Sequence, residues 1–272
     1  MTDVPIPWSA LDPTVDYYDS DHPACGEPGS DDGWSRMIGW GQDESVYASY
    51  AEKACGPVLE LCAGSGRISV RMAKVASHVT CVDASEPMLS ALRKRISVAK
   101  CVNVSVERQD ITRLALPGSF ALAVMAYNSF PLFASLDAQM SVLSAVRKHL
   151  GARGMLVLDC DNAHHISPMG RPPSFAFNRR HLVRGIAYSK WIGVGPMAAD
   201  QRVNVFGWYD EIMESSGCVR RRPWSSDQRA VYPSELKLMC QLAGYRDITL
   251  RGVFPGFPFS AQSSRFLIEA AV

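Results

Sequence analysis

The stretch Val58-Leu-Glu-Leu-Cys-Ala-Gly-Ser-Gly66 decides the fold of this chain, because it joins a short apolar strand to a turn of small residues. Gly64 and Gly66 can adopt backbone angles that are closed to other residues, so a ligand can approach the main chain closely there. A helical stretch and a second apolar strand follow, and that strand ends at Asp83. An acidic residue in this place binds the ribose in strand–turn–helix–strand nucleotide sites. The pattern therefore predicts a nucleotide-binding turn.

The composition favours a small or neutral partner. Hydrophobic residues make up 47% and charged residues 20% of the 272 residues, as in ordinary globular proteins. A net charge of +1 supplies no field for nucleic acid or for an anionic membrane. The polar start of the chain does not resemble a secretory signal, and no apolar run is long enough to span a membrane. The eight scattered cysteines include no Cys-x-x-Cys pair, so we expect reduced thiols and a cytoplasmic location.

Strands and helices alternate along the first part of the chain, which predicts an α/β fold with a parallel sheet and helices on both faces. The expected strands are residues 58–61, 79–82, 104–108, 120–126 and 155–159. The expected helices are residues 44–54, 68–76, 87–99 and 136–150, of which the last two begin after the capping residues Ser85 and Ser135.

The second part of the chain predicts an inserted sheet. A loop rich in proline and glycine is expected over 162–180, and the strand-like runs 181–192, 202–214 and 219–230 follow at short separations, as in antiparallel sheets. A helix over 233–243 and strands over 248–253 and 265–270 end the chain. We therefore divide it into an N-terminal arm or lid (1–45), a cofactor-binding α/β core (46–161), a loop with the β insertion (162–231) and a return to the core (232–272).

Two classes of nucleotide compete for the turn. A nicotinamide dinucleotide requires a third glycine for close packing of helix on strand, and Ser69 stands in that position. A larger constellation comprises Glu60, the turn itself, Asp83-Ala-Ser-Glu-Pro-Met88 and Asp110-Ile111 after the third strand. With these residues the chain resembles the class I S-adenosylmethionine-dependent methyltransferases, which have a Rossmann-like sheet. Cys62 departs from the family pattern, because it replaces the first glycine of the turn.

The resemblance implies S-adenosyl-L-methionine as cofactor and no metal. It assigns Asp83 to the ribose, Asp110 and Ile111 to the adenine, and the segment from Tyr127 to the cofactor and the acceptor. The full set of cofactor-binding residues that we predict is Tyr17, Glu60, Cys62, Ala63, Gly64, Gly66, Arg67, Asp83, Ala84, Met88, Asp110, Ile111, Tyr127 and Asn128.

The C-terminal part narrows the resemblance. The segments Tyr232-Pro-Ser-Glu-Leu236 and Ala243-Gly-Tyr245, together with the inserted sheet, are similar to the branch that contains sugar-amine and glycine-type N-methyltransferases. This branch implies a small-molecule methyl acceptor with an amine nitrogen, and O-methylation is a close variant. Natural product biosynthesis fits it, and a homodimer is one option for the assembly.

Methyl transfer requires the acceptor on the axis of the breaking bond, and a base that takes up its proton. His164 and His165 follow the fifth strand, at the edge where open α/β sheets bind ligands, and are our candidates for the base. Their alternative role is that of loop histidines. Tyr17 and Tyr18 in the arm are expected either to close over the sulfonium or to pack on the core. Tyr18 is our third catalytic candidate, and His22 is a weaker candidate for the base.

Three other functions remain as alternatives. A nucleic-acid methyltransferase needs a basic surface, which the neutral charge does not support. A methyltransferase-like partner protein without activity is less attractive, because Glu60, Gly64, Gly66 and Asp83 are all present. An oxidoreductase is the most distant alternative.

Overall fold

The computed structural model describes residues 13–22, 43–166, 174–183, 186–213, 217–252, 258–260 and 262–272. Most of the predicted arm, residues 1–12 and 23–42, and residues 167–173 of the predicted loop lie outside this part of the chain.

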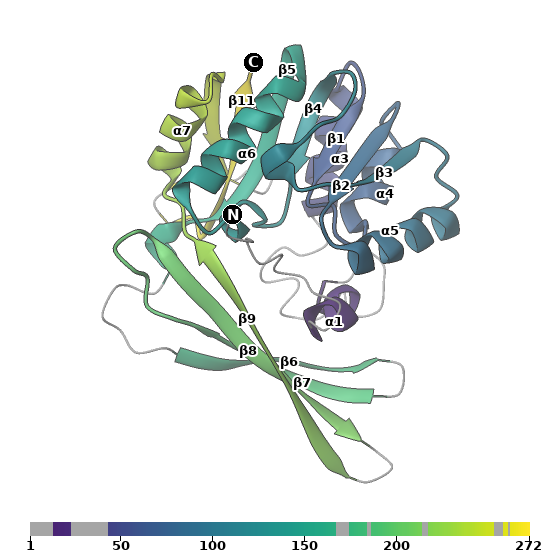
Figure 1. Ribbon diagram of the computed structural model, residues 1–272, viewed down its shortest axis with the longest axis vertical. Helices are drawn as coiled ribbons and strands as arrows, with labels where there is room; N and C mark the ends of the chain where they lie inside the picture. Colours follow the sequence, from purple (N-terminus) through teal and green to yellow (C-terminus); the bar gives the residue numbers. More distant parts are fainter. Residues whose placement is uncertain are drawn as a thin grey trace.

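The main sheet has seven strands in the order β10-β11-β5-β4-β1-β2-β3 (Figure 1). Strands β1 to β5 run parallel to one another, whereas β11 is antiparallel to both of its neighbours. The bounds are β1 Val58–Leu61, β2 Val79–Asp83, β3 Val104–Arg108, β4 Phe120–Met125, β5 Leu150–Asp161, β10 Arg246–Arg251 and β11 Arg265–Ala271.

Helices cover both faces of this sheet, as predicted. Alternate residues of each strand point to opposite faces, so Leu122 and Val124 of β4 pack on one side while Ala123 and Met125 pack on the other. The first side is covered by α3 Asp43–Lys53, α4 Arg67–Ala73 and α5 Glu86–Ala99, and the second by α6 Leu136–His149 and α7 Pro233–Leu242. Short 3-10 turns are η1 Ile111–Arg113, η2 Phe130–Leu132 and η3 Ala163–His165.

The two predicted helix caps are present. Ser85 Oγ accepts a hydrogen bond from the backbone N–H of Met88 at 3.5 Å, and Ser135 Oγ accepts one from Ala138 at 3.1 Å. These bonds satisfy donors that a helix start leaves without a partner inside the helix.

A second sheet of four antiparallel strands lies below the main one (Figure 1). It consists of β6 Ser174–Val183, β7 Ile186–Val194, β8 Arg202–Met213 and β9 Cys218–Arg229, and we call it the inserted sheet. The predicted antiparallel insertion is confirmed, but its strand count was wrong. The run 181–192 is divided between two strands, because Val183 pairs with Ile186, and β6 begins inside the predicted loop.

Helix α1, Pro13–Asp21, lies between the two sheets (Figure 1). Its carboxylate Asp21 accepts hydrogen bonds from Lys190 Nζ at 2.5 Å, Tyr209 OH at 2.6 Å and Tyr188 OH at 2.9 Å. Asp21 is fully buried, and a buried carboxylate is stable only when donors surround it in this way. These bonds fasten α1 to the inserted sheet.

Within the described residues, the helices are all too short or too polar to cross a bilayer. The seven cysteines in this part of the chain are free thiols.

Candidate functional site

The turn after β1 is held to the end of β2 by Asp83. The backbone N–H of Gly64 donates to Asp83 Oδ2 at 2.9 Å, and that of Ser85 donates to Asp83 Oδ1 at 2.8 Å. Gly64 has a φ of 56° and Gly66 a φ of 85°, in the left-handed region that favours glycine. The glycine turn therefore has the shape that the sequence predicted, and Asp83 fixes it.

Cys62 also adopts a left-handed conformation, with a φ of 55°. Burial raises the pKa of its thiol well above the ordinary value, and the neighbouring carboxylates of Asp83 and Asp110 act in the same direction. The thiol therefore stays neutral at physiological pH and forms an uncharged part of the wall.

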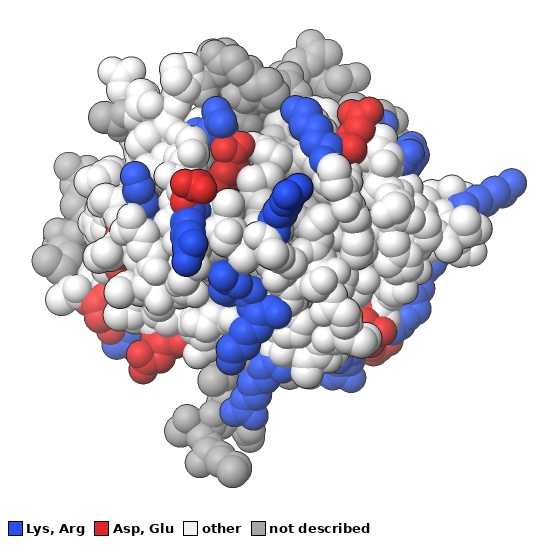
Figure 2. All heavy atoms as spheres, turned by 90° about the horizontal axis from the view of Figure 1, so that it is seen from above, with Lys and Arg blue, Asp and Glu red and all other residues white. Residues whose placement is uncertain are grey.

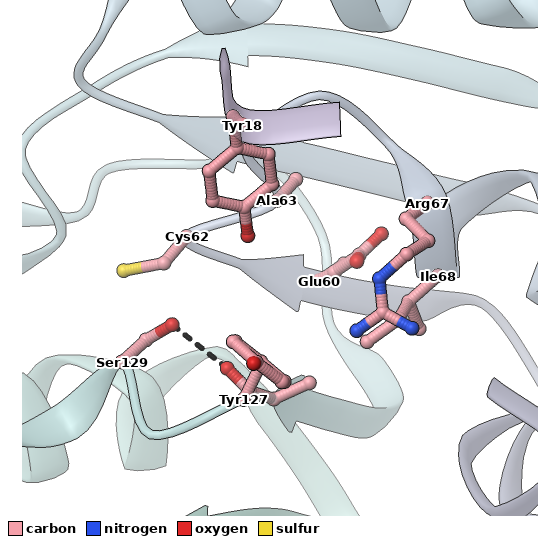
Figure 3. Close-up of a pocket in the computed structure, with 9 residues that line it drawn as sticks. Tyr18, Glu60, Cys62, Ala63, Arg67, Ile68, Tyr127 and Ser129 are labelled. Carbon is pink, nitrogen blue, oxygen red and sulfur yellow. Dashed lines mark hydrogen bonds between the residues drawn. The ribbon is translucent and has the colours of Figure 1, made fainter. Parts of the chain in front are cut away.

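A pocket opens above the turn (Figure 3). Tyr18 points into it from α1, Glu60 and Arg67 come from the two ends of the glycine turn, and Tyr127 closes it from the end of β4. Its lining comprises Tyr18, Glu60, Cys62, Ala63, Arg67, Ile68, Ala126, Tyr127 and Ser129. Six of these nine residues belong to the predicted site, and Ile68, Ala126 and Ser129 do not.

Two guanidinium groups flank the ring of Tyr127. The centre of the Arg67 guanidinium lies 5.3 Å from the ring centroid, and that of Arg265 lies 5.1 Å from it. Arg67 is paired with Asp43 at 2.7 Å and with Glu44 at 3.2 Å. Arg265 is paired with Asp159, so each cation that faces the ring also has a carboxylate partner.

Asp159 holds the turn that carries Tyr127. Its carboxylate accepts hydrogen bonds from the backbone N–H groups of Tyr127 at 2.5 Å and Asn128 at 3.2 Å, and also from the hydroxyl of Tyr47. Tyr127 and Asn128 have φ angles of 62° and 55°, which cost energy in residues other than glycine. The hydrogen bonds to Asp159 offset that cost and keep Tyr127 over the pocket.

Burial tunes the ionisable groups of the pocket. It raises the pKa of Glu60 to about 7 and that of Tyr18 to about 12, since removal from water disfavours the charged form of each group. Burial also raises the pKa of Tyr127 well above its ordinary value. Tyr18 and Tyr127 therefore remain neutral phenols at physiological pH, whereas Glu60 is divided between its two protonation states.

Tyr17, which we predicted to bind the cofactor, does not line the pocket of Figure 3. It packs against Tyr188 and Tyr209 of the inserted sheet, and its hydroxyl donates to Glu211 at 2.5 Å. Neighbouring residues of a helix point about 100° apart, so Tyr17 and Tyr18 cannot both face the pocket. Tyr17 thus packs on the inserted sheet, whereas Tyr18 lines the pocket.

His22 follows α1 on the side of Tyr18. Its Nδ1 lies 3.2 Å from the hydroxyl of Tyr127, and its ring lies edge-on to both tyrosines, with centroids 4.7 Å and 5.0 Å away. This weaker candidate of the sequence therefore contacts the wall of the pocket.

The predicted adenine residues lie at the far end of the turn. The carboxylate of Asp110 accepts hydrogen bonds from the N–H and the hydroxyl of Thr112, at 2.9 Å and 2.8 Å. Ile111 and Met88 are buried, and the carbonyl of Ala84 accepts a hydrogen bond from Arg108 at 3.2 Å. These residues do not line the pocket of Figure 3.

The predicted base candidates stand apart from the pocket. His164 and His165 form part of η3 and are exposed, and the ring of His164 lies edge-on to Tyr232 at a centroid distance of 4.7 Å. Asn162 accepts a hydrogen bond from the backbone of each histidine, which fixes the turn. The structure does not bring these two side chains together with Tyr127.

The sequence prediction did not include the ion pairs around Tyr127. Asp159 and Asp161 end the fifth strand, so their place at the carboxyl edge was a usable signal. Arg265 lies 106 residues further along the chain and begins β11, and no local pattern marks it.

The comparisons with known proteins agree with this geometry. Residues 58–154 match a family model described as a methyltransferase domain. The chain is 24% identical over 218 residues to the cypemycin N-terminal methyltransferase of a Streptomyces species. The aligned residues cover 78% of this chain and 81% of that relative.

Solved structures share the fold. The CcbJ methyltransferase from Streptomyces caelestis superimposes with a TM-score of 0.72 and 23% identity, over 94% of this chain and 95% of that one. CalS10 from Micromonospora echinaspora, an amino pentose methyltransferase with S-adenosylmethionine bound, gives a TM-score of 0.66 at 14% identity, over 89% and 93%. The chain therefore contains a methyltransferase domain over residues 58–154, and the glycine turn, Asp83 and the order of the main sheet give it the fold of the S-adenosylmethionine-dependent methyltransferases.

Proposed function

We propose that this enzyme transfers the methyl group to an amine nitrogen of a small molecule, such as a secondary metabolite, an amino sugar or an amino acid. The observation that carries the proposal is the charge at the carboxyl edge of the main sheet. Four carboxylates, Asp43, Glu44, Asp159 and Asp161, stand there against the two guanidinium groups of Arg67 and Arg265.

This set leaves a formal surplus of two negative charges beside the pocket. The surplus favours an acceptor that arrives as an ammonium ion, because opposite charges attract strongly where water is partly excluded. The neutral phenols of Tyr18 and Tyr127 add aromatic faces, which attract a sulfonium or a methylated ammonium. A carboxylate acceptor would meet repulsion at the same edge.

The residues around the glycine turn fit S-adenosylmethionine. Asp83 presents a carboxylate for the ribose hydroxyls, and Glu60 presents one for the ammonium of the methionine part. The guanidinium of Arg67 reaches the opposite side, where it suits the methionine carboxylate. Gly64, Gly66 and Ala63 have small or no side chains and leave room at the turn. We propose that Cys62 and Asn128 lie beside the methionine part. The residues that we propose for the adenine end are Asp110, Ile111, Met88 and Ala84.

The bound cofactor supplies an electrophilic methyl group on its sulfonium, so the protein's main contribution is alignment. Holding two reacting groups in line contributes roughly 7–11 kcal/mol in well-oriented systems. The left-handed turn at Tyr127, fixed by Asp159, provides a rigid wall for this alignment.

The cover over the pocket favours a small acceptor. Helix α1 and the inserted sheet lie across the carboxyl edge of the main sheet (Figure 1). The names of two similar proteins also mention amino acceptors, an N-terminus and an amino pentose. A small amine fits beneath such a cover, whereas a nucleic-acid duplex does not.

The net charge of +1 argues against a nucleic-acid acceptor, because a nucleic-acid methyltransferase depends on a basic surface. Figure 2 looks onto the end of the molecule opposite the inserted sheet, where Lys and Arg side chains lie among Asp, Glu and many uncharged side chains, and some of them adjoin one another.

The test is a competition between acceptor classes. The enzyme is incubated with S-adenosylmethionine that carries a ¹³C methyl group and with equimolar pools of small amines, phenols and carboxylic acids. The chemical shift of the transferred carbon then distinguishes N-methyl from O-methyl products. ¹³C-labelled N-methyl products that are absent with Asp83→Asn support the proposal. ¹³C-labelled O-methyl products from the phenol or acid pool contradict it.

A further inference from the structure

Two carboxylates end β5 on the same side of the strand, and their surroundings differ. Asp159 is fully buried and receives four donors: the Tyr47 hydroxyl, the backbone N–H groups of Tyr127 and Asn128, and Arg265. The side chain of Asp161 is 45% exposed. Within the described residues, one side-chain hydrogen bond reaches it, from Asn128 Nδ2 at 2.9 Å.

The contact of Asp161 with Arg265 leaves further capacity. Arg265 Nε lies 3.2 Å from Asp161 Oδ1, yet in the part of the chain described here this buried nitrogen has no partner with hydrogen-bond geometry. The pair is thus held by charge rather than by a saturating hydrogen bond. Asp161 keeps lone pairs that are directed to neither Asn128 nor Arg265.

Asn128 places Asp161 beside the pocket. The side-chain carbonyl of Asn128 accepts a hydrogen bond from the backbone N–H of Asp161 at 2.9 Å, so the two residues are joined by a reciprocal pair of bonds. Asn128 stands between Tyr127 and Ser129, which both line the pocket. Asp161 is therefore fixed at the carboxyl edge, hydrogen-bonded to a residue whose two chain neighbours line the pocket.

We infer that Asp161 is the carboxylate that binds the amino group of the methyl acceptor, while Asp159 acts as a positioning residue behind it. The inference rests on the proposed function, and it names the residue that recognises the amine. Two carboxylates with unlike environments commonly divide such tasks, and here Asp161 is the one that keeps acceptor capacity for an N–H of the ligand.

The proton balance is simple. The bound ammonium first loses one proton to the Asp161 carboxylate, which passes it to solvent. The neutral amine then donates an N–H to Asp161, which orients the nitrogen lone pair toward the methyl group. That lone pair forms the new C–N bond as the C–S bond breaks, and the electron pair of the broken bond remains on sulfur. The proton that the product ammonium then loses passes to the Asp161 carboxylate and from there to solvent.

The electrostatics agree with an exchanging proton. The partial burial of the Asp161 side chain raises its pKa, and the charge of Asp159 acts in the same direction, while that of Arg265 on β11 opposes it. A carboxyl group with a raised pKa takes up and releases a proton more readily at neutral pH than an ordinary one.

The experiment uses the enzyme saturated with S-adenosylhomocysteine, and cyclohexylamine as a probe that is an ammonium ion at neutral pH. Calorimetry measures the affinity of this probe, and of its uncharged analogue cyclohexanol, for the wild type and for three variants. Asp161→Asn removes the charge at nearly constant shape, and Asp161→Glu restores it. Glu107→Gln makes the same charge change at an exposed position of β3.

We expect the wild type to bind cyclohexylamine more tightly than cyclohexanol. Asp161→Asn should weaken cyclohexylamine binding roughly tenfold to a hundredfold, which is the effect of losing a hydrogen bond to a charged group. Asp161→Glu regains part of the loss, and Glu107→Gln binds like wild type. Equal affinities for the two probes, no cyclohexylamine binding to the wild type, or unchanged binding in Asp161→Asn each overturn the inference.

The same samples separate this inference from the proposed function. Every variant should bind S-adenosylhomocysteine within about twofold of wild type, since both substitutions of Asp161 keep the backbone N–H that donates to Asn128 and a side-chain oxygen that can accept from Asn128 Nδ2. If the wild type does not bind S-adenosylhomocysteine, the result counts against the proposed function. If it binds S-adenosylhomocysteine but does not distinguish cyclohexylamine from cyclohexanol, the result counts only against the role of Asp161.

Discussion

Gly66→Ala is the substitution for which the structure makes the sharpest prediction. Gly66 stands at the start of α4 with a φ of 85°. A Cβ at this position would lie 2.1 Å from Cδ1, 3.3 Å from Cγ and 3.5 Å from Cα of Leu92 on α5. Two separate costs therefore arise, one from the backbone and one from packing.

The two costs add to a substantial loss of stability. A left-handed conformation costs a residue other than glycine about 1–2 kcal/mol. Forcing an extra carbon into a packed core costs about 1–3 kcal/mol, because Leu92 is fully buried and must leave its rotamer. We expect Gly66→Ala to lower the free energy of unfolding by about 2–5 kcal/mol.

Gly118→Ala is the matched control. Gly118 has a φ of 80°, and apart from Gly118 and its two chain neighbours no heavy atom of the described residues lies within 4 Å of the Cβ that alanine would add. Gly118→Ala should therefore lower the free energy of unfolding only by the backbone cost, about 1–2 kcal/mol. Urea denaturation followed by circular dichroism measures both. Equal losses in the two variants would refute the packing argument, as would a Gly66→Ala effect that is unchanged in a Leu92→Ala background.

Three further predictions follow from buried carboxylates. Burial raises the pKa of Glu60 from 4.5 to about 7, so the folded protein holds this proton more tightly than the unfolded chain does. The resulting contribution to stability is complete below pH 4.5 and is lost as the pH rises toward 7. Glu60→Gln should remove this dependence and stabilise the apo protein above pH 7 by about 3 kcal/mol, and unfolding curves with the same pH dependence as wild type would argue against it. Asp83→Asn should weaken S-adenosylhomocysteine binding by about tenfold or more, because the ribose and the N–H of Gly64 lose a charged acceptor, and calorimetry with an unchanged affinity would contradict this. Asp21→Asn leaves the ammonium of Lys190 without its buried partner, so hydrogen exchange in α1 should accelerate, and unchanged protection would show that these bonds do not fasten the helix.

The local parts of this fold were predictable from the sequence. The strand before the turn, the strand after it and Asp83 are consecutive features, and β1 and β3 have the predicted bounds. Ser85 and Ser135 mark helix starts because a cap acts on its own first turn. The pattern of the glycine turn was enough to find Glu60, Gly64 and Gly66.

The parts that depend on distant residues were not. Asp159 and Arg265 meet only because β5 and β11 pair in register, and Arg67 meets Asp43 only because α3 packs on α4. The faces of α1 presented the same difficulty, since Tyr17 and Tyr18 are alike in sequence and are separated by the contacts of Tyr17 with the inserted sheet. Nonlocal pairing leaves no mark in a single sequence.

The central claim is tested most directly by two separate calorimetric titrations of the wild-type protein, one with S-adenosylhomocysteine and one with NADH. The claim is that the glycine turn, fixed by Asp83, forms the cradle of a methyl donor. It predicts saturable heat with a stoichiometry of one S-adenosylhomocysteine per chain, and none with NADH. Saturable binding of NADH without any heat from S-adenosylhomocysteine would contradict it.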